Sequence, residues 1–158
     1  MDMNYEAQER TIRNLVDALK ALREGGVTSN KTDLTCQISE WLVKEIFNGT
    51  LASTSINKDW DLIVGEKRIQ VKAHAKAATN KNRKTHISYS EAALIDELII
   101  VVFTQDYALR EFYSVPWSKA LQLISHNKGG SILSWNRLKA YRLDIESLPN
   151  QPVVSLFK

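Results

Sequence analysis

The sequence predicts a mixed α/β protein in which helices flank one central sheet. The first part of the chain carries apolar residues at helical spacing, and after residue 50 the pattern changes to the alternation typical of strands. A continuous apolar run over residues 98 to 104 predicts a buried central strand. Helical segments on both sides of a strand-rich middle favour helices packed on a sheet.

The bulk composition is that of one ordinary globular domain. The chain has 158 residues, of which 44% are hydrophobic and 25% charged, so we expect a single domain over residues 1 to 158. No apolar run is long enough to span a membrane, and residues 1 to 10 do not resemble a secretion signal, which predicts a cytoplasmic protein without a membrane partner. Cys36 is the single cysteine, which excludes an internal disulfide.

Two helices are expected before residue 50. Apolar residues recur at helical spacing from residue 5 to about 23, and Gly25-Gly26 should end this first helix. The second helix should cover about residues 33 to 48, with Thr32 or Asp33 as its N-cap and Gly49 as a left-handed terminator. Its predicted buried stripe consists of Leu34, Ile38, Trp41, Leu42 and Ile46.

The second half of the chain should supply further strands and helices. Residues 77 to 87 are typical of a polar loop, and Ser90 is expected to cap a short helix through Ile95. After the central strand, residues 110 to 115 predict a partner strand, and residues 117 to 124 an amphipathic helix that follows Pro116. A last strand is expected over residues 141 to 145.

Residues 59 to 64 and 67 to 75 predict a hairpin whose register follows from its turn. Gly65-Glu66 suits a two-residue type II′ turn, which places Leu62 opposite Ile69 and Asp61 opposite Gln70. Alternation then directs Asp61, Gln70 and Lys72 to one face, and apolar neighbours to the other.

This register predicts a group of metal ligands. Directly opposed residues of an antiparallel pair have Cβ atoms about 4.5 to 5.5 Å apart, so Asp61 and Gln70 can offer side-chain oxygens to one ion. Together with the Val71 main-chain carbonyl they form a partial shell suited to Mg²⁺. Lys72 lies on the same face, where an ammonium group can orient water or offset charge on phosphate oxygens.

Residues 59 to 72 resemble the central motif of PD-(D/E)XK nucleases, in which an Asp enters one strand and (E/D/Q)-x-Lys follows in an apolar strand. Glu40, in the preceding helix, stands where this superfamily often carries a Glu. The resemblance implies a restriction-endonuclease-like core and a metal-dependent DNA endonuclease that uses Mg²⁺, or Mn²⁺ in its place. It also implies a catalytic set of Glu40, Asp61, Gln70 and Lys72, although Gln70 stands where Glu or Asp is usual, and a neutral ligand should weaken metal binding.

A basic segment follows this motif and is the predicted contact with DNA. The net charge of the chain is +3, and bases far outnumber acids between residues 66 and 86, which suits neutralisation of phosphates. The predicted DNA-binding residues are His74, Lys76, Lys81, Arg83 and Lys84. Cutting both strands of a duplex usually needs two active centres, which favours a homodimer; the first helix either supplies that contact or packs on its own core.

Simpler interpretations stay open beside these. Asp61 can simply begin a strand, with Gln70 and Lys72 on a solvated face, and Glu40 can form an ordinary surface pair with Lys44. Asp59 is an alternative ligand if the turn is longer. At the level of function, the alternatives are a DNA-binding module without catalysis and a protein-interaction domain.

Overall fold

The computed structural model describes residues 6–28, 33–53 and 59–158. Its α-helices are α1 (Glu6–Glu24), α2 (Leu34–Phe47), α3 (Trp117–Leu123) and α4 (Gln151–Val154). Its strands are β1 (Thr50–Leu51), β2 (Leu62–Val64), β3 (Lys67–Lys76), β4 (Lys84–His86), β5 (Glu97–Thr104), β6 (Leu109–Pro116), β7 (Ser125–Asn127), β8 (Gly130–Ser134) and β9 (Arg142–Leu143). Short 3₁₀ helices are η1 (Trp135–Tyr141), η2 (Ile145–Ser147) and η3 (Ser155–Phe157).

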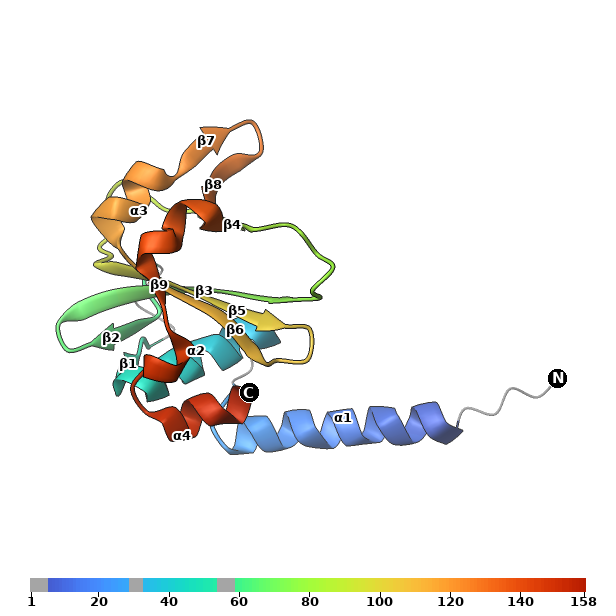
Figure 1. Cartoon of the computed structure of the whole chain (residues 1–158). Helices are drawn as coiled ribbons and strands as arrows, with labels where there is room; N and C mark the ends of the chain where they lie inside the picture. Colours follow the sequence, from blue (N-terminus) through green and yellow to red (C-terminus); the bar gives the residue numbers. More distant parts are fainter. Residues whose placement is uncertain (1–5, 29–32, 54–58) are drawn as a thin grey trace.

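The main sheet is mixed, as the sequence predicts. Six strands lie in the order β1-β2-β3-β5-β6-β9, with β3 and β5 parallel and the other neighbours antiparallel. A second sheet of three strands, β4-β8-β7, was not predicted. Figure 1 shows this small sheet on one side of the main sheet and α2 on the other. The fold is therefore α/β with a mixed central sheet.

Strand β5 lies at the centre of the molecule and is buried on both faces. Ile99, Val101 and Phe103 belong to the hydrophobic cluster that α2 and α4 cover. Its alternate residues belong to a second cluster, beneath α3, η1 and β8; they are Leu98, Ile100 and Val102. The predicted central strand is thus confirmed, and its two faces divide the core into two halves.

Helix α2 confirms most of its predicted pattern. Asp33 is the N-cap, since its side chain accepts a hydrogen bond from the Cys36 N–H at 3.1 Å; Thr32 lies outside the described residues. Of the predicted stripe, Ile38, Leu42 and Ile46 are buried, and Leu34 and Trp41 pack partly buried against the same cluster.

The prediction for the end of α2 is wrong in one residue. Asn48, with φ of 53°, takes the left-handed position that was expected at Gly49. Glycine is needed at position 49 for another reason. A Cβ there would lie 2.8 Å from the Ile63 carbonyl oxygen and 3.0 Å from the side chains of Leu62 and Val64. Gly49 therefore permits the close approach of the chain to β2.

The hairpin has the predicted register. Val64 pairs with Lys67, Ile63 with Arg68 and Leu62 with Ile69. Gly65 has a φ of 60°, as the first turn residue of a primed turn requires. Strand β2 begins at Leu62, however, later than predicted, whereas β3 extends to Lys76. The second half of β3 consequently has no β2 residue beside it.

Later elements follow the sequence with two corrections. Strands β5 and β6 and helix α3 occur close to their predicted positions, and the last strand shortens to Arg142–Leu143 between 3₁₀ helices. The helix predicted from Ser90 to Ile95 is wrong, because this segment forms turns in which Ala93 N–H bonds the Ser90 carbonyl at 3.0 Å. Ile95 is buried next to β5, which begins at Glu97. The few residues between Ser90 and Ile95 are too short a segment to offset the cost of nucleating a helix. The polar loop predicted over residues 77 to 87 ends early, since Thr85 is buried within β4.

The first helix projects from the rest of the protein. Figure 1 shows α1 leading away from the main sheet. Its predicted first residue, Tyr5, lies outside the described part of the chain. No described helix is both long and apolar enough to cross a membrane.

The two residues at the end of α2 allow a direct test of the correction. We expect Gly49→Ala to lower the free energy of unfolding by about 1 to 3 kcal/mol, because the added Cβ forces apart α2 and β2. Asn48→Gly, which keeps the left-handed conformation available, should change it by less than about 0.5 kcal/mol. Urea unfolding of both variants measures this difference, and equal stabilities would contradict the assignment.

Candidate active site

Asp61 lies one residue before β2, at the uncovered edge of β3. Its N–H bonds the Ile69 carbonyl at 2.8 Å, which continues the ladder by one step and brings its side chain next to Gln70. The carboxylate Oδ2 accepts hydrogen bonds from the Val71 N–H at 2.7 Å and from Gln70 Nε2 at 3.0 Å. The carboxylate thereby takes the place of a strand carbonyl where β2 has not yet begun.

The same geometry gives the direction of the Val71 carbonyl. The N–H and C=O of one strand residue point to the same side, so the Val71 carbonyl also points toward the edge where Asp61 lies. Asp61 therefore contacts both the Gln70 amide and the Val71 N–H, and the Val71 carbonyl points to the same edge of β3.

Gln70 is placed with its amide nitrogen, and not its amide oxygen, toward Asp61. In this arrangement the Nε2–H group stabilises the carboxylate charge directly. To ligate a cation that Asp61 also binds, the Gln70 amide has to turn so that Oε1 replaces Nε2. The rotation needs only the terminal side-chain torsion, which has a broad energy profile.

Lys72 enters a polar hollow on the face of the sheet that bears β4 and β8. Because Gln70 pairs with Leu98 and Lys72 with Ile100, their side chains lie on the face of the sheet that Leu98 and Ile100 share. The hollow measures about 390 Å³. Besides Lys72 it is lined by His86, Ile87, Ser88, Tyr89, Gly130 and Ser131. The sequence did not predict these partners, since the strand pairing of β4 with β8 joins residues 84–86 to residues 132–134.

Glu40 is partly buried on α2, one helical turn after Cys36. The pKa of the Cys36 thiol is raised to about 12, chiefly by burial and by the hydrogen bond to Asp33. The charge of Glu40 raises it further, whereas the charge of Lys72 lowers it. The charges of Glu40 and Lys72 therefore act in opposite directions on the pKa of the Cys36 thiol, while Lys44 forms an ion pair with Glu45 at 2.7 Å.

These residues fit a hard cation by the kind of atoms they offer. Carboxylate, amide and carbonyl oxygens are the ligands that Mg²⁺ and Mn²⁺ take in proteins, with water and substrate oxygens completing the shell. Within residues 6–28, 33–53 and 59–158, no group of three or more His, Cys, Asp or Glu side chains is placed to hold a metal ion. The neutral Gln70 gives the site a low negative charge, as the sequence predicts.

His74 lies on the same strand face as Gln70 and Lys72, but its side chain contacts Thr85 and Trp135 of the protein itself. Its Nε2 hydrogen-bonds Thr85 Oγ1 at 2.8 Å, and Trp135 Nε1 donates to the same oxygen at 2.7 Å. Burial, followed by the charges of Lys76 and Lys72, lowers the pKa of His74 to about 4. His74 is therefore neutral near pH 7.

Lys76 and Arg83, which were predicted to bind DNA, lie around the ring of Trp135. The Lys76 ammonium is 4.6 Å from the ring centroid and donates to the Asn82 carbonyl at 2.6 Å. The Arg83 guanidinium is 5.4 Å from the same centroid. These cation–π contacts tie the two ends of the loop over residues 77–83 to η1.

Arg83 also holds a buried acid that sequence reasoning missed. Its guanidinium donates to the Glu111 carboxylate at 3.0 and 3.3 Å, and the Glu111 side chain is only 5% exposed. Arg142 approaches the same carboxylate at 3.3 Å. Glu111 lies in the predicted strand next to the central one, but its partners are distant in sequence, so no local pattern reveals the pair.

Lys81 and Lys84 differ from these residues because both are exposed. Lys81 makes only a long contact of 3.5 Å with the Ala78 carbonyl, and Lys84 begins β4. Of the predicted DNA-binding set, these two therefore present their ammonium groups to solvent.

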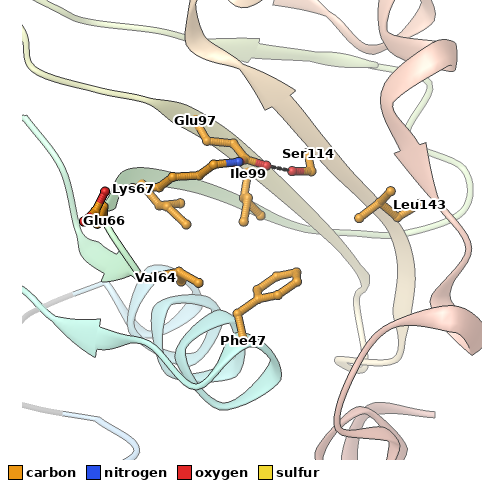
Figure 2. A pocket seen from close by; sticks show the side chains of 10 residues that line it. Phe47, Val64, Glu66, Lys67, Glu97, Ile99, Ser114 and Leu143 are labelled. Carbon is orange, nitrogen blue, oxygen red and sulfur yellow. Dashed lines mark hydrogen bonds and ion pairs between the residues drawn. The ribbon is translucent and has the colours of Figure 1, made fainter.

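A second hollow lies on the face of the main sheet that α2 covers, beside Ile69 and Ile99. Figure 2 shows Phe47 and Val64 on one side of it and Glu97 on the other. It measures about 560 Å³, and five of its ten lining residues are aliphatic or aromatic. Lys67 pairs with Glu97 at 3.3 Å, and Ser114 donates to the same carboxylate. The acid and the base at its rim are thus engaged with each other.

Comparison with known proteins assigns the chain to no family. No protein-family model matches it, and no curated protein has a significantly similar sequence.

Because the pKa of His74 is lowered in the folded protein, we expect the protein to lose stability in acid. An unfolded histidine has a pKa of about 6.5, so the unfolded chain binds more protons than the folded one between about pH 4 and 6.5. The free energy of unfolding should therefore fall as the pH drops through this range. His74→Gln, which retains a hydrogen bond to Thr85, should remove on the order of 2 kcal/mol of that loss.

Urea unfolding at several pH values measures the effect. The matched control is His126→Gln, because His126 is exposed in β7 and hydrogen-bonds Ser131. If His74→Gln and His126→Gln had the same pH profile as the original chain, the buried neutral state of His74 would be refuted.

Proposed function

We propose that the protein is a Mg²⁺-dependent DNA endonuclease with a restriction-endonuclease-like core. The observation that carries the proposal is the contact of the Asp61 carboxylate with the Gln70 side chain and the Val71 N–H at the edge of β3, with Lys72 two residues after Gln70 on the same strand face. The motif resembles that of PD-(D/E)XK nucleases, and the mixed sheet with α2 on one face is compatible with such a core. The polar hollow that Lys72 lines, on the strand face of Gln70, supports the proposal because it offers room for a phosphate group next to the Lys72 ammonium.

Each side chain has a distinct role in this proposal. Asp61, Gln70 and the Val71 carbonyl hold Mg²⁺, or Mn²⁺, with Glu40 adding negative charge from α2. The cation supplies positive charge to a phosphate oxygen and lowers the pKa of water. Lys72 donates hydrogen bonds to the phosphate and orients the attacking water. Attack of the water oxygen on phosphorus breaks one P–O ester bond and leaves a phosphate monoester and a hydroxyl.

In the same proposal, some residues of the basic segment contact DNA and others hold the loop in place. Lys81 and Lys84 contact the DNA backbone, because their exposed ammonium groups can neutralise phosphates. Lys76 and Arg83 position the loop over residues 77–83 through Trp135, and neutral His74 supports β4 through Thr85. The positive charge of all four cations still contributes to the field that attracts DNA.

One observation favours a second candidate, a DNA-binding module without catalysis. The Gln70 amide donates to Asp61 at 3.0 Å, and the Val71 N–H donates at 2.7 Å. These two donors both stabilise the negative charge of the carboxylate. Such a module would bind DNA through Lys81 and Lys84 equally well in Mg²⁺ and in EDTA.

The test is cleavage of plasmid, linear and branched DNA in Mg²⁺, Mn²⁺ or EDTA. Asp61→Asn keeps an oxygen for the Val71 N–H but removes the charge, so it should fold and lose about 100-fold or more in rate. Lys72→Ala should lose a similar factor. Gln70→Glu restores an anionic ligand and should lower the Mg²⁺ concentration for half-maximal cleavage by about tenfold.

The exposed Lys139, on η1, supplies the control, and Lys139→Ala should cut at the original rate. Cleavage that persists in Asp61→Asn would come from another centre or a contaminant and would refute the site. Binding of DNA that is equal in Mg²⁺ and EDTA, with no cleavage by the original chain or by Gln70→Glu, would favour the binding module.

A further inference from the structure

Helix α1 carries an apolar face that the described fold leaves uncovered. Leu15 and Val16 are 56% and 54% exposed, and Leu19 and Leu22 are only partly buried. No described helix or strand packs extensively along α1, and Figure 1 shows it leading away from both sheets. Of the two alternatives left open for the first helix, packing on the protein's own core does not occur over Leu15 and Val16.

The sequence of α1 has the spacing of a coiled coil. Ile12, Leu15, Leu19 and Leu22 follow at intervals of three, four and three residues, which are the a and d positions of a heptad repeat. The helix has 19 residues and is therefore about 28 Å long. Most of the stability of a protein helix comes from packing of its apolar face. The heptad spacing and the exposure of Leu15 and Val16 together favour a second helix packed along this apolar face.

We propose that α1 pairs with α1 of a second copy of the chain as an antiparallel two-helix coiled coil. The charged residues that flank the apolar a and d positions favour a second copy of α1 as the partner, in the antiparallel orientation. The e positions of the repeat carry Glu9, Val16 and Arg23 in sequence. In an antiparallel pair e positions face e positions, so position 9 of each copy meets position 23 of the other and two attractive pairs form. The core layers join Leu15 to Leu19 and Ile12 to Leu22 of the second copy.

Other arrangements lack this complementarity. In a parallel pair the e positions meet the g positions, which are the uncharged Thr11, Ala18 and Gly25, and no ion pair results. A membrane surface is a poor occupant, because helices that bind anionic lipid carry an excess of Lys and Arg. Here the segment EAQERTIRNLVDALKALRE balances its acids with an equal number of bases.

The inference does not depend on the proposed function, since it rests on α1 alone. If both hold, the dimer brings two copies of the Asp61 site into one particle, as cutting of both strands of a duplex requires.

Sedimentation equilibrium of the full chain tests the proposal. The original chain should be a dimer, and Leu15→Glu should shift it to monomer by raising the dissociation constant at least about 100-fold, since a buried charge in the seam is unpaired. Leu94→Glu is the matched control because Leu94 is 60% exposed outside α1, and it should remain a dimer. Circular dichroism establishes that each variant is folded.

A charge exchange tests the direction. Arg23→Glu should weaken the dimer at low salt by about 3- to 10-fold, and the double variant Glu9→Arg with Arg23→Glu should restore it. A monomeric original chain, or a dimer that Leu15→Glu leaves intact, would overturn the inference. A double variant weaker than Arg23→Glu alone would overturn the antiparallel pairing.

Discussion

The burial of β5 on both faces is the constraint on which the rest of the structure depends. Leu98 to Phe103 alternate between two hydrophobic clusters, so each side of the strand needs its own cover. Helices α2 and α4 cover one side, and α3, η1 and β8 cover the other. The parallel partner β3 inherits this division, which puts Val71 with α2 and Lys72 with the small sheet. On the polar face of β3, Lys72 consequently lines a hollow, whereas His74 and Lys76 pack against Trp135.

Asp61 has a structural role at the edge of β3 and a proposed role as a metal ligand. A substitution that removes its side chain, such as Asp61→Ala, would remove both. Its carboxylate completes the β3 edge by accepting the Val71 N–H, and the same oxygen receives the Gln70 amide. A charged group fixed by main-chain geometry is pre-organised for a ligand, because little side-chain entropy remains to be lost on binding. The simpler interpretation, in which Asp61 only begins a strand, accounts for the hydrogen bond from the Val71 N–H. It does not require the hydrogen bond from the Gln70 amide or the polar hollow at Lys72.

The sequence predicted what depends on short-range chemistry. The Gly65-Glu66 turn determined the hairpin register, and the helical spacing after Asp33 determined which side of α2 is buried. It did not predict the sheet of β4, β7 and β8, whose strands are short and mostly exposed and so lack a period-two signal. Partners such as Arg83 and Glu111 are brought together only by this sheet and β6. The apolar spacing of α1 predicted a helix, but spacing alone does not show whether its face is covered.

The most direct test of the central claim, that Asp61 and Gln70 form a metal centre, is a nuclear magnetic resonance titration with Mg²⁺. In the original chain, the Gln70 side-chain amide and Val71 backbone N–H signals should shift, because the Gln70 amide turns and the carboxylate exchanges a hydrogen-bond donor for the cation. The Gln151 amide, which bonds the Ile145 and Leu148 carbonyls, should not shift. The account predicts that Asp61→Asn abolishes both shifts. Signals of Gln70 and Val71 that stay fixed in Mg²⁺, or that shift equally in Asp61→Asn, would contradict it.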